Sequence, residues 1–280
     1  MHITSYFKVS LDMRPTTMIY AFEWYRAALI SVIFYFLRGD RHGGLDFGNY
    51  LRNDIIVRTQ DGLVVLVRRN SDDSVNYLTS KKPWTRKWFR PREGETVLDC
   101  GSSVGSFSIL AARSGSKVIS FEANPEVFQV LYRNIELNSV SGNIKPFNVA
   151  LADEVGTAKL SVPGEGSGAG TIVTKYADDF KSQKKEMKTY DVPKITLDSF
   201  CKELNLIDWL LIDVESAELM VLKGAKEALK KTKRVIVEVD YANKDDVFAI
   251  LDSARFLLVE SGSLDPVNQY HYFVNTDLLN

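Results

Sequence analysis

The residues of this chain with the clearest capacity for chemistry surround two glycines near its middle. Asp99 follows a short apolar run, Gly101 and Gly105 come next, and Glu122 lies 21 residues after Gly101. Glycines after a strand let backbone amides and a helix N-terminus approach a ligand, and an acidic residue after the next strand can bind ribose hydroxyls. A carboxylate at Asp99 is awkward beside a pyrophosphate, but it suits a ligand with an amino group and a sulfonium.

The flanking sequence predicts the elements that position these residues. Residues 96–98 and 118–121 are short apolar runs typical of buried parallel strands, and residues 107–113 between them favour a helix. The dinucleotide fingerprint requires glycines at the first, third and sixth positions of the turn, but here Ser103 and Ser106 occupy the last two. The alternative to a specific nucleotide site is any doubly wound domain with a tight first turn.

The rest of the chain predicts one α/β domain, because strand and helix patterns alternate from residue 97 to residue 261. Asp61-Gly62 predicts a hairpin between residues 54–58 and 63–68, in a small layer beside the main sheet. The glycine-rich residues 163–170 predict a substrate loop or a hairpin tip. Further strands are expected at 144–151, 157–162, 209–213 and 234–240, helices at 125–138, 196–204, 217–231 and 245–254, and a closing antiparallel pair at 256–261 and 270–275.

Composition limits the class of protein. The 280 residues, 45% of them hydrophobic, suffice for one large core. The 35 basic and 36 acidic residues indicate no global attraction to nucleic acid. Cys100 and Cys201 form neither a disulfide framework nor a zinc cluster, which favours a reducing, cytoplasmic compartment. The three scattered histidines predict no metal site.

Residues 18–37 form the most apolar segment and predict a helix with an apolar stripe. Glu23 and Arg26 interrupt it, and the uninterrupted apolar run of residues 27–37 is too short to cross a membrane. We expect the helix to pack on the domain or in a homodimer interface, with peripheral contact to a membrane surface as the alternative. The stripe comprises Met18, Phe22, Tyr25, Leu29, Val32 and Phe36.

Residues 81–92 hold six basic residues and no acidic one, with Trp84, Trp88 and Phe89 between them. This composition can bind phosphate or another anionic surface. We favour instead a solvated face whose aromatic side chains lie under the sheet, because short charged runs of this kind are common on surfaces.

Three segments together resemble the FkbM family of S-adenosylmethionine-dependent methyltransferases. They are residues 97–108, residues 118–126 with Asn134-Ile-Glu-Leu-Asn138, and residues 195–200 continuing through residues 211–225. The resemblance covers about residues 54–262. It implies a doubly wound, mostly parallel seven-stranded Rossmann-like sheet with an N-terminal helix and a β-hairpin extension. We therefore expect a helical extension at 1–53, a hairpin layer at 54–92 and the methyltransferase domain at 93–280.

The resemblance also implies which residues bind S-adenosylmethionine. Asp99, Gly101 and Gly105 would hold the methionine moiety, with Ser102 and Ser103 in the same turn, and Glu122 would bind the ribose. Ala123, Asn124 and the backbone around Ala150 would border the adenine, and Asp213 would face the methyl group. The family usually has glycine where Ser216 stands and commonly Asn near Ser103, so the shape of these loops is expected to differ.

The expected reaction is O-methylation of a sugar, glycan or small natural product, because that is the activity for which the family is mainly known. A carboxylate base suits a hydroxyl acceptor, and Asp213 and Glu215 are the candidates, with Glu238 and Asp240 in reserve. The other interpretation is that Asp213 only positions the cofactor. Three alternative functions remain: an RNA or protein methyltransferase, a non-catalytic binding module, and a membrane-associated enzyme acting on lipid-linked glycans. Against the first, Asp213-Val-Glu-Ser stands where amide and exocyclic-amine methyltransferases have the Asn-Pro-Pro-Tyr signature.

Overall fold

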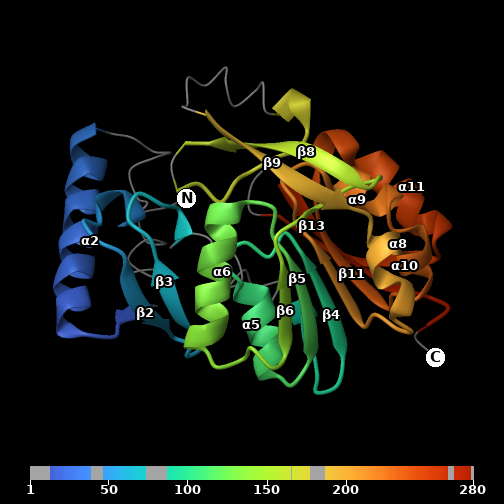
Figure 1. Cartoon of the computed structure of the whole chain (residues 1–280), viewed down its shortest axis with the longest axis horizontal. Coiled ribbons are helices and arrows are strands. Elements are labelled where there is room, and N and C mark those ends of the chain that lie inside the picture. The colour runs from blue at the N-terminus through green and yellow to red at the C-terminus, as the bar shows by residue number, and fades with distance from the viewer. Residues whose placement is uncertain are drawn as a thin grey trace.

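The computed structural model describes residues 13–38, 47–73, 87–164, 166–176, 187–263 and 268–278. Within these residues, seven strands form one sheet in the order β12-β13-β11-β10-β4-β5-β6 (Figure 1). The strands from β11 to β6 pair in parallel, whereas β13 and β12 are antiparallel. This confirms the predicted doubly wound, mostly parallel sheet. Its strands are β4 (Thr96–Cys100), β5 (Lys117–Phe121), β6 (Ile144–Phe147), β10 (Trp209–Ile212), β11 (Arg234–Asp240), β12 (Phe256–Ser263) and β13 (Asn268–Asn275).

Helices cover both faces of this sheet (Figure 1). Alternate strand residues serve the two cores: Val97 of β4 packs with the core under α5 and α6, and Leu98 packs with the core under α9 and α11. The first group is α5 (Ser106–Arg113) and α6 (Pro125–Leu137). The second is α8 (Leu197–Phe200), α9 (Glu218–Lys223), α10 (Lys226–Lys230) and α11 (Lys244–Ser253), with short 3-10 helices at Cys201–Glu203 and Tyr241–Asn243.

The predicted hairpin is present and belongs to a three-stranded antiparallel layer. β2 (Ile55–Thr59) pairs with β3 (Val64–Val67) and also with β1 (Met13–Pro15), a strand that the sequence did not predict. β1 lies before the predicted domain boundary at residue 53 and β2 lies after it, yet the two strands pair in one sheet. The division of the chain into domains stays a prediction.

Asn134 of α6 and Asn138, which caps the C-terminal end of α6, attach this layer to the main domain. The Leu66 backbone amide donates to Asn134 Oδ1 at 2.8 Å. The Val64 amide donates to Asn138 Oδ1 at 3.0 Å, and Asn138 Nδ2 returns a hydrogen bond to the Val64 carbonyl at 2.7 Å. Four-residue spacing puts both side chains on one helix face, where they satisfy the free edge of β3 as a further strand would.

The N-terminal helix α2 (Met18–Arg38) forms and packs on the layer as predicted, but the stripe residues whose side chains are described, Met18, Phe22, Tyr25 and Leu29, are exposed. Trp24 and Ala27 are fully buried against the layer, whereas Phe22 and Leu29 point to solvent. The 3.6-residue period indicated one apolar stripe, but the layer covers the other side of the helix, through Trp24 and Ala27. No helix among the described residues is both long and apolar enough to span a membrane. A short 3-10 helix, η1 (Phe47–Tyr50), follows in the described part of the chain.

The single strand expected at residues 144–151 is wrong. β6 ends at Phe147, and β7 (Ala150–Leu151) joins a second sheet in the order β7-β9-β8. Asn148 Nδ2 donates to the carbonyls of Glu122 and Ala123 at 2.8 and 3.1 Å, and these bonds hold the chain where it leaves the main sheet. The second sheet contains β8 (Gly156–Pro163) and the unpredicted β9 (Met187–Ile195).

The helix expected at residues 217–231 is divided, because α9 ends before Gly224 and α10 starts at Lys226. A Cβ on Gly224 would lie 2.2 Å from the Ala152 carbonyl oxygen, so the chain passes too close to its neighbour to carry a side chain there. The helix expected at residues 196–204 is also shorter than predicted: α8 ends at Phe200, and a 3-10 turn follows it.

The basic residues 81–92 are described only from Lys87 onward. Trp88 and Phe89 are buried in the core under the sheet, and Lys87 Nζ contacts Glu260 Oε2 at 2.7 Å. This part agrees with the expectation of buried aromatic side chains. Residues 81–86, like most of the polar run 181–188, lie outside the described residues.

Candidate active site

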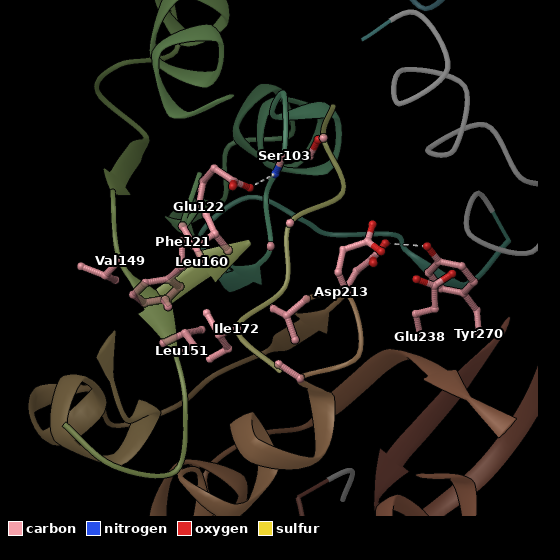
Figure 2. A pocket seen from close by; sticks show the side chains of 18 residues that line it. Ser103, Phe121, Glu122, Val149, Leu151, Leu160, Ile172, Asp213, Glu238 and Tyr270 are labelled. Carbon is pink, nitrogen blue, oxygen red and sulfur yellow. Dashed lines mark hydrogen bonds between the residues drawn. The ribbon is translucent and has the colours of Figure 1, made fainter. Parts of the chain in front are cut away.

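A cavity opens at the carboxyl ends of β4, β5, β10 and β11 (Figure 2). The chain moves outward from β4 to β6 on one side and from β10 to β11 on the other, so the strand order reverses between β4 and β10. Ligands of open α/β sheets bind at such a switch point. Of the predicted site residues, those on the wall are Gly101, Ser103, Glu122, Ala123, Ala150, Asp213, Glu215 and Glu238.

The first turn is shaped by close backbone contacts. Gly101 has φ +83°, and a Cβ there would lie 1.8 Å from the carbonyl oxygen of Asp213. Gly105 has φ +93°, and a Cβ there would lie 2.6 Å from Leu131 Cδ1. Gly101 therefore lets β4 and β10 end side by side, and Gly105 lets the start of α5 pack against α6.

Glu122 follows β5 and is held by two backbone amides. Ser103 donates to one carboxyl oxygen at 2.9 Å and Asn124 to the other at 2.8 Å. Burial raises the pKa of Glu122 to about 7, with smaller contributions from the charges of Asp99 and Asp213. Each carboxyl oxygen retains a lone pair, so the group can accept hydrogen bonds from two adjacent hydroxyls of a ribose.

Four predicted cofactor residues lie behind the wall: Asp99, Ser102, Gly105 and Asn124. The Ser108 hydroxyl donates to Asp99 Oδ2 at 2.5 Å, and burial raises the pKa of Asp99 to about 6. Ser102 Oγ donates to the Asp99 carbonyl at 2.8 Å. Their direct contact with a cofactor stays a prediction, since the observed contacts support the turn.

Asn124 connects the start of α6 with the glycine-rich segment. Its Oδ1 accepts from the Glu126 amide at 3.0 Å, and its Nδ2 donates to the Ser167 carbonyl at 3.3 Å. The Gly168 amide donates to both oxygens of Asp72, at 2.8 and 3.0 Å. These contacts hold Gly168 on the cavity wall, so the segment 163–170 reaches the site.

One end of the cavity is apolar. Phe121 and Val149 form one part of it, Leu160 approaches from β8 of the second sheet, and Ile172 follows Thr171, which bridges to Ser161 of β8 (Figure 2). Ala123, Ala150 and Leu151 complete this wall. An apolar slot beside the ribose-binding carboxylate suits the flat face of a nucleobase.

The other end of the cavity is acidic. Tyr270 donates to Asp213 Oδ2 at 2.6 Å, and Glu238 lies beside the same tyrosine (Figure 2). Tyr270 is the strand partner of Glu238, which explains why β13 brings its ring here. Burial and the neighbouring carboxylates raise the pKa of Tyr270 well above its usual value, so the phenol keeps its proton and remains a donor.

Glu215 stands in strained backbone next to Asp213. It has φ +53°, and Ser216, where the family usually has glycine, has φ +74°. Burial raises the pKa of Glu215 to about 8, and the charges of Asp213 and Glu218 add to this effect. Glu218 itself accepts from the amides of Val214 and Ser216, which gives it a structural role at the start of α9.

The reserve candidate Asp240 lies away from the wall. It accepts from the Tyr176 hydroxyl at 2.5 Å and from the Ala242 amide at 2.9 Å. Among the described residues that line the cavity none is basic, while Glu122, Asp213, Glu215 and Glu238 are acidic. No three His, Cys, Asp or Glu residues in the described ranges are grouped to hold a metal ion.

Tyr270 and the segment around Ile172 are site residues that sequence reasoning missed. The sequence predicted a strand at residues 270–275 but not its register against β11. That register places Tyr270 opposite Glu238 and so brings the tyrosine to the site. Register in an antiparallel pair cannot be derived from residue spacing within one strand.

Comparison with known proteins identifies the family. Residues 99–263 match the methyltransferase FkbM domain, which is more than half of the chain. The chain belongs to the FkbM methyltransferase family. This confirms the resemblance of the sequence and supports S-adenosylmethionine as the cofactor of the protein; the residues that bind it stay a prediction.

Three relatives show the range of similarity. Methyltransferase sdnD of Sordaria araneosa is 29% identical over 168 residues, which are 51% of this chain and 65% of that protein. Hexuronic acid methyltransferase AglP of Haloferax volcanii is 29% identical over 177 residues, or 58% and 64%. The tRNA (uracil(54)-C(5))-methyltransferase of Pyrococcus furiosus is 29% identical over 119 residues, or 39% and 28%. The chain matches less than two thirds of the length of each.

The residues present fit S-adenosylmethionine. Gly101 leaves the backbone of the first turn open to the ligand, Glu122 suits the ribose, and the apolar end suits the adenine. The acidic end suits a ligand with a sulfonium and an amino group, because carboxylates in a partly dry cavity attract positive charge.

Proposed function

We propose that this protein transfers the methyl group of S-adenosylmethionine to a neutral hydroxyl of a sugar, glycan or small natural product. The observation that carries the proposal is the Asp213 carboxylate at the acidic end of the cavity, held by the Tyr270 hydroxyl at 2.6 Å. A positioned carboxylate can take the proton that a hydroxyl loses when it is methylated.

The chain contributes alignment and proton acceptance. When bound, the cofactor supplies an electrophilic methyl group for in-line displacement. Asp213 accepts the hydroxyl proton, and Tyr270 holds this carboxylate in a single orientation. Glu215 is the second candidate base: with a pKa of about 8 it is mostly protonated at neutral pH until positive charge enters the cavity.

The electrostatics of the wall favour a neutral acceptor over an anionic one. Glu215 and Glu238 lie beside Asp213, and the described wall holds no basic side chain that could pair with an acceptor carboxylate. A uronic acid carboxylate would therefore meet like charge. The acceptor's hydroxyl group, in contrast, can donate a hydrogen bond to any of these carboxylates.

The test is methyl transfer from isotope-labelled S-adenosylmethionine to three classes of acceptor: neutral glycosides, uronic acids and tRNA. We expect labelled ethers, stable to mild base, from a neutral glycoside or another hydroxyl compound. The variant Asp213→Asn should lower kcat by a factor of about 100 to 10,000. The exposed variant Glu203→Gln is the matched control and should retain full activity.

Three results would contradict the proposal. Base-labile esters on uronic acids would show a carboxylate acceptor. Label in tRNA without any glycoside product would favour a nucleic-acid methyltransferase, as in the relative from Pyrococcus furiosus. Cofactor binding without turnover on any hydroxyl compound would indicate a binding module.

A further inference from the structure

The outward face of α2 presents a row of large apolar side chains to solvent, which we call the α2 ridge. Its described members are between 58% and 90% exposed. They recur at steps of three and four residues and therefore follow one side of the helix. The α2 ridge comprises Met18, Ile19, Phe22, Tyr25 and Leu29.

The opposite face of α2 holds the helix firmly in place. Trp24 and Ala27 are fully buried against the three-stranded layer. Glu23 accepts two hydrogen bonds from Arg26, at 2.7 and 3.0 Å, and a further one from the Arg52 amide. Glu23 and Arg26 are the two charged residues in the sequence between positions 18 and 37. Because they pair with each other, the α2 ridge is apolar without interruption.

The position of α2 makes the ridge accessible to a flat surface. The helix is the outermost element at one end of the molecule, with the three-stranded layer between it and α6 (Figure 1). From Met18 to Leu29 the ridge extends over about 17 Å. Contiguous apolar side chains on a protein surface mark an interaction site, whereas single exposed apolar side chains are common on any soluble protein.

The charge beside the α2 ridge has the sign that an anionic surface requires. The described ranges 13–38 and 47–73, which hold α2 and the three-stranded layer, contain seven basic and five acidic residues. Arg14 on β1 and Arg52 after η1 are exposed, and both β1 and η1 contact α2.

We propose that the α2 ridge docks the protein on a lipid bilayer that contains anionic lipids. The apolar side chains enter the boundary between headgroups and acyl chains, with Phe22 and Tyr25 as aromatic anchors, and the arginines contact the headgroups. A second copy of the chain suits the ridge less well. A symmetric dimer through α2 would bring the exposed arginines of two copies toward one another, and a stable dimer needs about 20–30 residues a side.

The test is flotation of the full chain with vesicles of phosphatidylcholine alone and of phosphatidylcholine with about 30% phosphatidylserine. We expect binding to the anionic vesicles that weakens as salt rises. The double variant Phe22→Ser/Leu29→Ser should bind at least tenfold more weakly, because it removes two exposed anchors without touching the core. Arg14→Ala should weaken binding about fivefold.

Tyr132→Ser, which removes an exposed aromatic side chain from α6, is the matched control and should bind as the wild type does. Unchanged circular dichroism and melting temperature would show that all variants are folded. Wild type that stays unbound on anionic vesicles would overturn the proposal, as would equal binding of the double variant. A dimer in light scattering that the double variant converts to monomer, without vesicle binding, would assign the ridge to a second copy.

Discussion

Binding of S-adenosylmethionine should release protons from the acidic cavity. In the cofactor-free protein the pKa of Glu215 is about 8, and the pKa of Glu122 is about 7. At pH 7 these values leave about nine-tenths of Glu215 and about half of Glu122 protonated. A positive charge within about 4–6 Å lowers a carboxyl pKa by about 1–3 units. Entry of the sulfonium should therefore release about one proton per cofactor.

The direction of the pH dependence follows from the protonation state of the carboxyl groups that the bound cation favours. Positive charge stabilises the ionised carboxylates, so binding releases protons and affinity rises with pH until the pH exceeds about 8. S-adenosylhomocysteine has no sulfonium and no net charge, so its binding should depend less on pH. With a fall of about 1–3 units in the pKa of about 8, we expect the preference for S-adenosylmethionine over S-adenosylhomocysteine to increase about 5- to 50-fold between pH 6 and pH 8.

The assay is calorimetric titration at pH 7 in two buffers with different ionisation enthalpies, because the difference in measured heat gives the number of protons released. Glu215→Gln should remove most of the release, and the exposed variant Glu136→Gln should leave it unchanged. Proton uptake, or equal release with both ligands, would refute the assignment of the sulfonium to the acidic end.

Three further predictions follow from named contacts. Tyr270→Phe should lower kcat about tenfold with little change in cofactor affinity, because Asp213 loses its positioning hydrogen bond; an equal loss in both quantities in steady-state kinetics would argue against positioning. Asn134→Ala should lower the free energy of unfolding by about 2–4 kcal/mol, because the Leu66 amide and the Val104 carbonyl lose their hydrogen-bond partner. Urea titration measures this change, and an unchanged unfolding midpoint would contradict the prediction. The cofactor-free protein should melt at a lower temperature at pH 8 than at pH 6, because carboxyls with raised pKa values bind protons in the folded state that the unfolded chain has lost; a melting temperature that rises with pH would be inconsistent.

The elements around the first turn could be predicted from local pattern. β4, α5 and β5 follow one another within 26 residues, and each has the apolar period and glycine boundary of its type. The same reasoning failed where a distant contact decides the path of the chain. Asn148 and Gly224 mark such points, since a carbonyl elsewhere in the fold sets the bend at each.

The candidate site could be predicted in part for the same reason. Gly101, Glu122 and Asp213 each follow a strand that the sequence indicates, and parallel strands bring their ends together. Tyr270 comes from an antiparallel strand whose register depends on the whole sheet. The orientation of α2 was also beyond the sequence, because the covered face carries Glu23 and Arg26, whose pairing becomes evident only in the packed structure.

The most direct test of the central claim is equilibrium titration of S-adenosylmethionine into the wild type, Glu122→Ala and the exposed control Glu136→Ala. We expect a dissociation constant in the micromolar range for wild type and control, and at least tenfold weaker binding by Glu122→Ala. Equal affinity of Glu122→Ala, or no binding by folded wild type, would contradict the assignment of this cavity as the cofactor site.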